Sequence, residues 1–306
     1  MKKRIPFSKG FFPCAILSCL VIASGVFSLA TRGLNLGIDF KPGVIEEVVI
    51  KGAAGIEDVR AALSGIGGAS VKKIGASSSD EYQIRAGVEE GSDGKIEQAL
   101  IGRYGEGSIE VLKTDFIGSS MSSSLARQSI FLLVGTMLLI WVYATVRFHW
   151  DFALGSIIAL LHDICIMFTF FTWSRLEFST TTLAAVLTIV GYSINATVVI
   201  LDRVRYNLPL MEVKSFKELI NQSLSDTLAR SIITTVTTLF AVLSLYIFTS
   251  GSVKDFALAM TVGLLSGCYS SIFISSGFIS FVRRNWKPEF GIHHAKPKQV
   301  QGAPAL

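Results

Sequence analysis

Residues 191–207 read G-Y-S-I-N-A-T-V-V-I-L-D-R-V-R-Y-N and place polar side chains inside a segment long enough to cross a membrane. Tyr192, Ser193 and Asn195 interrupt the apolar run, which ends in charged residues beginning with Asp202. A hydroxyl or amide that faces lipid loses its water partners without replacement, so such residues normally face a bundle interior, a cavity or a partner helix. Close helix packing is an equally common use of a single Ser or Asn. The stretch therefore predicts a membrane helix with at least one neighbouring helix.

The rest of the chain has the composition of a polytopic membrane protein. Half of its 306 residues are apolar, 17% are charged, and the mean hydropathy is +0.54. A helix needs about 20 apolar residues to cross the hydrocarbon core, and lipid-exposed backbone must satisfy its own hydrogen bonds. Six stretches meet this length and predict six membrane helices, at roughly 11–31, 129–146, 153–173, 180–201, 231–249 and 256–282.

Lys and Arg residues in the short connections indicate the orientation of the chain. With the N-terminus inside, the inner connections carry most of the basic residues, whereas the short outer loops carry only Arg175 and Lys254. Both termini are therefore expected on the cytoplasmic side, and the net charge of +5 reflects topology and lipid contact rather than nucleic-acid binding. Lys2, Lys3 and Arg4 before the first apolar run also resemble a signal peptide. The run is long, which favours an uncleaved anchor.

A polar stretch of about 95 residues, 32–127, lies between the first two predicted helices and is large enough for a small domain. Strand patterns at 44–51, 69–74, 81–86 and 108–112 alternate with helical patterns at 56–63 and 96–104. The order βαββαβ predicts a ferredoxin-like α+β sandwich on the outer side of the membrane.

Two further segments complete the organisation into 1–31, 32–127, 128–282 and 283–306. The inner connection 202–230 has apolar residues at helical spacing beside charged ones, which predicts an amphipathic helix in the membrane interface; a solvated loop is the alternative. The tail 283–306 is polar and rich in Pro, as disordered segments are. The four cysteines lie in predicted membrane helices without metal-ligand spacing.

Several motifs in this order resemble the SecF family of the bacterial protein-export machinery. They are Gly37-Ile38-Asp39-Phe40 with Gly43, the turn 147–155, Leu160-Leu161-His162-Asp163, the Ser193-Ile194-Asn195 run, Asn221-Gln222-Ser223-Leu224 with Arg230, and Asp255-Phe256-Ala257-Leu258 followed by 267–273. Pro42 stands where the family usually has Gly. Each motif is weak alone, but their joint order and spacing make coincidence improbable.

The resemblance implies half of an RND-type transporter bundle in the bacterial inner membrane, in complex with SecD. It further implies association with the SecYEG channel, a translocating preprotein and an associated insertase. The proton gradient, or sodium in some lineages, would move the outer domains that assist export and release. It implies no covalent chemistry, so we expect no enzymatic activity, catalytic residue, cofactor or metal.

The family's ion pathway relies on an Asp directly after Ser-Ile-Asn and on an Arg at the start of the fifth helix. Arg230 is present, but the Asp position is Ala196, which cannot carry a proton. Three interpretations stay open. In the first, SecD supplies the carboxylate while Arg230, Asn195 and Thr197 give polar support. In the second, Asp163, next to His162, has become the carrier. In the third, Ala196 is an engineered or inactivating change. Asp202 at the inner end of the fourth helix is expected to be an anchor or local ion-pair partner that supports this region.

Two other functions fit the same architecture. One is a subunit of an RND-type exporter of small molecules or lipids, although such exporters carry larger outer domains. The other is a structural membrane subunit without energy coupling, which the loss of the carboxylate at Ala196 would explain.

Overall fold

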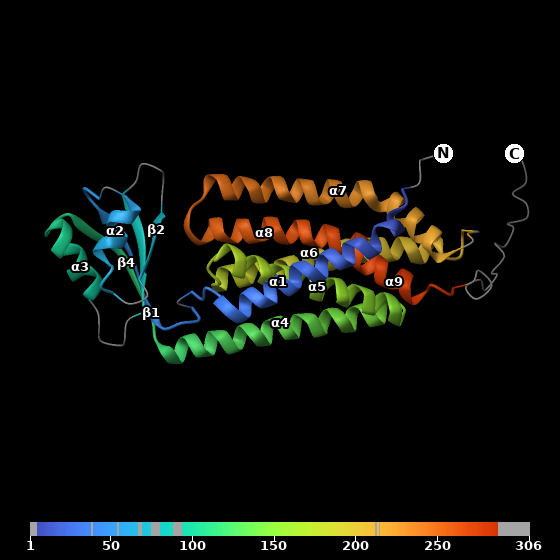
Figure 1. Cartoon of the computed structure of the whole chain (residues 1–306), viewed down its shortest axis with the longest axis horizontal. Helices are drawn as coiled ribbons and strands as arrows, with labels where there is room; N and C mark the ends of the chain where they lie inside the picture. The colour runs from blue at the N-terminus through green and yellow to red at the C-terminus, as the bar shows by residue number, and fades with distance from the viewer. Residues whose placement is uncertain are drawn as a thin grey trace, which may run out of the picture.

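The computed structural model describes residues 5–286 except 38, 54, 67–68, 75–79, 88–93, 212 and 214. Figure 1 shows a long helical bundle with a small sheet domain at one end. We call that end of the bundle the domain end, and the opposite end, where α1 begins and α9 finishes, the terminal end. The first four residues and most of the predicted tail, residues 287–306, lie outside the described residues.

Six long apolar helices build the bundle, which confirms the predicted fold class. They are α1 (Phe11–Arg32, preceded by the short 3-10 helix η1, Phe7–Lys9), α4 (Ser119–Arg147), α5 (Trp150–Ser174), α6 (Thr180–Asn207), α7 (Phe216–Phe248), and the continuous run of α8 (Gly251–Tyr269), the π-helical turn η2 (Ser270–Ser275) and α9 (Ser276–Val282). Half or more of the apolar window of α5, α6 and the α8 run is buried, against 17% or less for α1, α4 and α7. The helices α5, α6 and the α8 run therefore form the centre of the bundle, and α1, α4 and α7 lie at its periphery.

Two glycines one turn apart bring α8 close to α6. A Cβ on Gly263 would lie 2.0 Å from Ile189 Cδ1, and a Cβ on Gly267 would lie 3.1 Å from Ser193 Cβ. Because carbon atoms normally approach to about 3.5–4.0 Å, only glycine allows this distance at Gly263. The close contact also lets Ser193 reach a buried carboxylate on α5.

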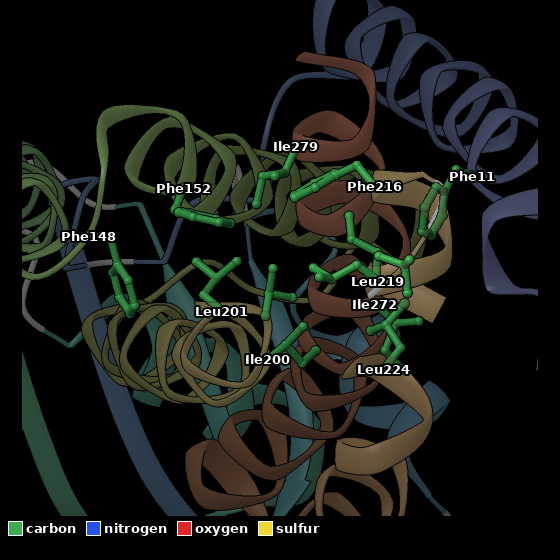
Figure 2. Close-up of a cluster of buried hydrophobic side chains, with 13 residues drawn as sticks. Phe11, Phe148, Phe152, Ile200, Leu201, Phe216, Leu219, Leu224, Ile272 and Ile279 are labelled. Atoms are coloured by element: carbon green, nitrogen blue, oxygen red, sulfur yellow. The ribbon is translucent and has the colours of Figure 1, made fainter. Parts of the chain in front are cut away.

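An aromatic and aliphatic cluster fills the terminal end of the bundle (Figure 2). Phe152 of α5, Leu201 of α6, Leu219 of α7 and Ile279 of α9 are all 2% exposed or less. A second cluster around Phe171 and Phe178 fills the domain end. Polar contacts of the central helices lie between the two clusters.

The connection before the fifth membrane helix differs from the prediction. Phe216, Leu219, Ile220 and Leu224 do form one apolar face, but they belong to a single helix, α7, that runs on through the membrane segment. Their side chains are buried against α6 and α9 instead of lying in the lipid interface. The prediction of a separate interfacial helix is therefore wrong, since helical periodicity shows that a face is covered but not what covers it.

The sheet domain contains β1 (Gly43–Ile50), α2 (Ile56–Ala62), β2 (Ser70–Ile74), β3 (Glu81–Ala86), α3 (Lys95–Tyr104) and β4 (Ile109–Ile117). Its strands lie in the order β2-β3-β1-β4, all antiparallel, so the βαββαβ prediction is confirmed. Tyr82, Ile84 and Leu100 pack in the core between the sheet and its helices. The helices cover the sheet face that points away from the bundle, and the open face points toward it (Figure 1).

Candidate functional site

Asp163 is a fully buried carboxylate in the middle of α5. It lies about 20 Å along the helix from Trp150, at about 1.5 Å per residue, and none of its surface is exposed. Ser193 of α6 and Ser270 of η2 donate hydrogen bonds to Oδ2 at 2.5 and 2.7 Å, and Ser266 of α8 donates to Oδ1 at 2.6 Å. Three hydroxyl donors, one each from α6, α8 and η2, thus replace the water that the carboxyl group loses on burial.

A second set of polar contacts runs from Asp163 toward α1. His162 Nδ1 lies 3.2 Å from Asp163 Oδ1, and His162 Nε2 lies 3.0 Å from Ser18 Oγ. Ser18 Oγ lies 2.9 Å from the Tyr269 hydroxyl, which donates to the Cys14 carbonyl oxygen at 2.8 Å. Asp163 is thereby connected through one imidazole to the hydroxyls of two other helices.

A cavity of about 180 Å³ lies beside this chain of contacts. Its lining includes Ser18, His162, Ser266 and Tyr269, together with apolar side chains of α1, α5 and α8. The cavity is open at the bundle surface and mostly apolar, its volume is several times the roughly 30 Å³ that a water occupies in the liquid, and its hydroxyls and imidazole are the polar groups that could bind water. The cavity therefore adjoins both the imidazole and one of the hydroxyl donors to the carboxylate.

The residues predicted around the Ser-Ile-Asn run point in different directions. Ser193 and Thr197 are buried, Ala196 is half-buried, and Asn195 is exposed on the bundle surface. Within the described residues, neither the Asn195 side chain nor the Thr197 hydroxyl has a hydrogen-bond partner. The helix thus turns Ser193 toward Asp163 and Asn195 away from the subunit.

Arg230 and Asp202 lie at a separate pocket of about 620 Å³ toward the terminal end, between α6 and α7. Asp202 accepts a hydrogen bond from Arg147 at 2.9 Å, and Arg203 binds Asp226 at 2.6 Å. Arg230 is exposed and makes no ion pair within the part of the chain that the structure describes. Arg230 and Asp163 share neither a contact nor a pocket, so the structure does not bring these two predicted residues together.

Sequence reasoning missed the partners of Asp163. Asp163 itself is bonded to Ser266 and Ser270, whereas Ser18 and Tyr269 reach it through His162. These residues come from both ends of the chain, and only their positions in space relate them to Asp163. The spacing of four residues between Ser266 and Ser270 was the one available signal, because it places both hydroxyls on the same helix face. Among the described residues, no cluster of His, Cys, Asp and Glu could hold a metal ion.

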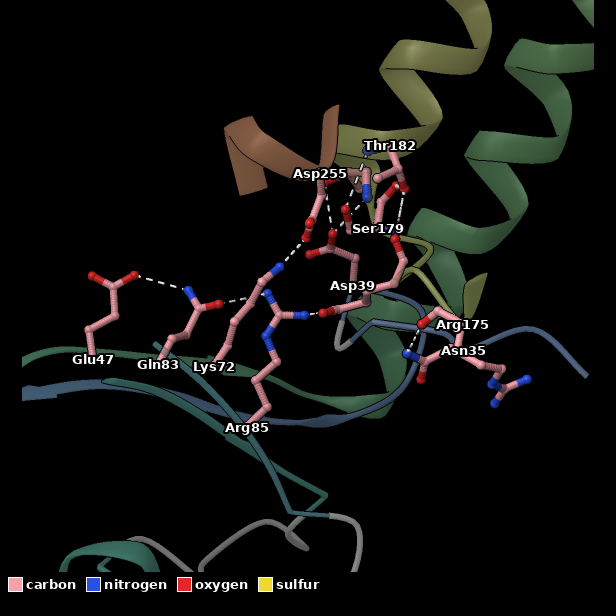
Figure 3. Close-up of polar contacts among 12 residues, drawn as sticks. Asn35, Asp39, Glu47, Lys72, Gln83, Arg85, Arg175, Ser179, Thr182 and Asp255 are labelled. Atoms are coloured by element: carbon pink, nitrogen blue, oxygen red, sulfur yellow. Dashed lines mark hydrogen bonds and ion pairs between the residues drawn. The ribbon is translucent and has the colours of Figure 1, made fainter. Parts of the chain in front are cut away.

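Polar contacts also attach the sheet domain to the domain end of the bundle (Figure 3). On its open face, Lys72 of β2 binds Asp255 of α8, and Arg85 of β3 pairs with Glu177 between α5 and α6. Burial lowers the pKa of Arg85, while the nearby carboxylates of Asp39, Asp255 and Glu47 oppose that shift. The domain is therefore held to the bundle by charges on two adjacent strands.

The motif at 37–40 makes a second attachment. The Gly37 amide donates to the Phe178 carbonyl at 2.9 Å, and a Cβ on Gly37 would lie 2.4 Å from Glu177 Oε1. Asp39 Oδ2 accepts from the amide and the hydroxyl of Thr180 at 2.7 and 2.8 Å, at the first residue of α6. A carboxylate at a helix N-terminus accepts hydrogen bonds from the free backbone amides and interacts favourably with the positive end of the helix dipole. The segment after α1 therefore caps α6.

The comparisons with known proteins agree with this architecture. Residues 97–285 match the C-terminal family of the protein export membrane proteins SecD and SecF, and residues 27–45 match the SecD/SecF GG motif. SecF protein translocase subunits from Treponema pallidum and Rhodothermus marinus are 40% and 38% identical, over 93% and 91% of this chain and 98% and 93% of theirs. The chain belongs to the SecF family. It is thus a protein translocase subunit of the Sec export machinery. The alternative of an RND-type exporter of small molecules or lipids is therefore excluded.

A solved structure also resembles this chain in its three-dimensional fold. SecDF, a translocon-associated membrane protein from Thermus, is 29% identical and superposes with a TM-score of 0.82 over 93% of this chain. The match covers only 39% of that SecDF chain. This SecF family member therefore spans about two fifths of the SecDF protein that it resembles.

Proposed function

We propose that this chain works with a SecD subunit beside the SecYEG channel and couples the proton or sodium gradient to movement of the sheet domain during preprotein export. The bacterial inner membrane, with both chain termini in the cytoplasm, is the setting that this function requires. The observation that carries the proposal is the exposed polar face of α6 and α7, where Asn195 and Arg230 lie without partners among the described residues. An amide and a guanidinium at membrane depth need polar neighbours, which a second half-bundle supplies.

The Thermus SecDF comparison supports the same partner. In that protein one chain contains a region like this one and a larger remainder, and we infer that SecD supplies the equivalent of the remainder beside this region. Transporter ion sites lie at the interface between related halves, where polar groups of both can meet. Asn195 and Arg230 are then the contribution of this chain to that interface, with the carboxylate supplied by SecD, whereas Thr197 is buried within this chain.

Site-specific photo-crosslinking in cells tests this arrangement. A photoreactive residue at Asn195 should capture SecD, whereas the same residue at Leu139 of α4, which is 73% exposed, should capture lipid. Purification in mild detergent should then recover SecD together with SecYEG. Recovery of a homo-oligomer without SecD, or equal capture of SecD from both positions, would refute the proposal.

Gradient coupling needs its own measurement. Export into inverted membrane vesicles that contain the complex should increase when a proton or sodium gradient is imposed, and dissipating the gradient should remove the increase. A complex that assembles normally but gives gradient-independent export would instead be the non-coupling structural subunit.

A further inference from the structure

The hydrogen-bond directions around His162 determine where its first proton lies. The Tyr269 hydroxyl has one hydrogen, which it donates to the Cys14 carbonyl oxygen, so Tyr269 must accept in its contact with Ser18. Ser18 therefore donates to Tyr269, and its oxygen is left to accept from His162 Nε2. His162 carries a hydrogen on Nε2.

The contact between His162 and Asp163 then requires a second proton. Nδ1 and Oδ1 are 3.2 Å apart, and a hydrogen bond between them needs a hydrogen on one of the two atoms. The pair is either an imidazolium with a carboxylate or a neutral imidazole with a carboxylic acid. Both forms have no net charge, which suits a site where Asp163 is fully buried and His162 is 7% exposed.

Removal of that proton would set a lone pair of Nδ1 against a carboxylate and leave one net negative charge in the bundle. Among the residues that the structure describes, the groups that donate to this carboxylate are the hydroxyls of Ser193, Ser266 and Ser270. The other charges on α5 lie elsewhere: Asp151 binds Arg283 of α9 and contacts His149, about 18 Å along the helix by the rise per residue. Of the titratable groups near the pair, Tyr269 of α8 reaches it through Ser18, and Cys14 of α1 contributes only its carbonyl oxygen.

We propose that Asp163 and His162 form a proton-binding site within this subunit, which holds one proton and exchanges it through the cavity between α1, α5 and α8. His162 and Ser266 both line the cavity, so a water molecule bound there could contact the imidazole and a hydroxyl donor to Asp163. Ser18, Ser193 and Ser270 tie the site to α1, α6 and η2, so release of the proton changes the contacts of several membrane segments together. Only the use of this proton for export rests on the function proposed above.

Spectroscopy of the full chain in lipid nanodiscs tests the site without SecD. Nitrogen-15 NMR of labelled histidine reports the charge of His162, identified by loss of its signal in His162→Gln. Infrared difference spectra between wild type and Asp163→Asn report whether Asp163 carries a proton. At neutral pH one member of the pair, and only one, should carry the second proton, and transfer into D₂O should exchange that proton for deuterium.

The matched control is His149→Gln, which removes a largely exposed histidine near the start of α5 and should leave the Asp163 band unchanged. A neutral His162 beside an ionised Asp163 at neutral pH, or both groups protonated, would overturn the proposal. A spectral change on adding sodium at constant pH would overturn it as well, since it would identify a metal cation as the ligand. None of these outcomes depends on whether SecD copurifies, so failure of the site and failure of the proposed function remain distinguishable.

Discussion

Gly263→Ala should open the contact between α6 and α8 and disturb the Asp163 site without touching it. The new Cβ would lie 2.0 Å from Ile189 Cδ1 and 2.4 Å from Cγ1. Because a normal carbon contact is about 3.5–4.0 Å, the helices must separate by roughly 1.5 Å unless Ile189 leaves its rotamer, which is stiff for a β-branched residue in a helix. Overpacking of this kind costs about 1–3 kcal/mol.

The separation also strains the hydrogen bonds to Asp163. Ser193 donates from α6 and Ser266 from α8, at 2.5 and 2.6 Å, so the carboxylate cannot follow both helices. A bond between two oxygens weakens beyond about 3.0 Å, and loss of one buried partner costs about 1–3 kcal/mol more. The free energy of unfolding should therefore fall by about 2–6 kcal/mol in total.

Reversible unfolding of the full chain in mixed micelles, followed by near-UV circular dichroism, measures this change. Gly191→Ala on α6 is the matched control, because nothing lies within 4 Å of the added Cβ, and it should be neutral or slightly stabilising. Adding Ile189→Ala to Gly263→Ala should recover about 0.5–3 kcal/mol relative to the sum of the single changes. If Gly263→Ala unfolds like the control, or Ile189→Ala gives no recovery, the close-contact argument is wrong.

The remaining predictions concern the ion path and the sheet domain. Arg230→Ala should reduce gradient-dependent export without loss of assembly, and Arg230→Lys should rescue it only in part because an ammonium lacks the planar donor fork; unchanged export in the Ala variant would exclude a relay role. Ala196→Asp should raise proton flux through the SecD complex if the ancestral path persists. Asp163→Asn should abolish the flux if Asp163 is the carrier. Unchanged flux in both variants would leave SecD as the sole carrier. Lys72→Met should free the sheet domain from α8 and increase protease access to the joint, and equal cleavage of wild type and variant would refute this. Burial and the nearby Asp58 carboxylate raise the pKa of Tyr104 from 10.0 to about 12. The contribution of the neutral Tyr104 side chain to sheet-domain stability is therefore complete below about pH 10 and is lost as the pH rises toward 12. Tyr104→Phe should remove that loss, as measured by unfolding at several pH values.

The fold could largely be predicted because hydrophobic patterns carry it. Long apolar runs predicted six helices, and alternation between strand and helix periods predicted the order of the sheet domain, both of which the structure confirms. The extent of α7 could not be predicted in this way. An apolar face such as that of Phe216 and Leu219 has the same periodicity whether lipid or another helix covers it.

The candidate site was predicted only in part. Asp163 and His162 stood out because charged or titratable groups are rare in membrane helices. Their partners did not, since a serine in a helix commonly bonds to its own backbone and gives no sign of a distant acceptor. Ser18 and Ser270 are separated by most of the chain, and only the packing of α1 and the α8 run around α5 brings Ser18 to His162 and Ser270 to Asp163.

The capping of α6 by Asp39 couples the sheet domain mechanically to a central membrane helix. Its carboxylate holds the first residue of α6, and four residues later the same segment enters β1 at Gly43. β1 is hydrogen-bonded on both sides, to β3 and to β4, so it cannot shift without carrying the sheet. A tilt or rotation of α6 would therefore displace Asp39 and, through four residues of backbone, β1 and the sheet that is hydrogen-bonded to it.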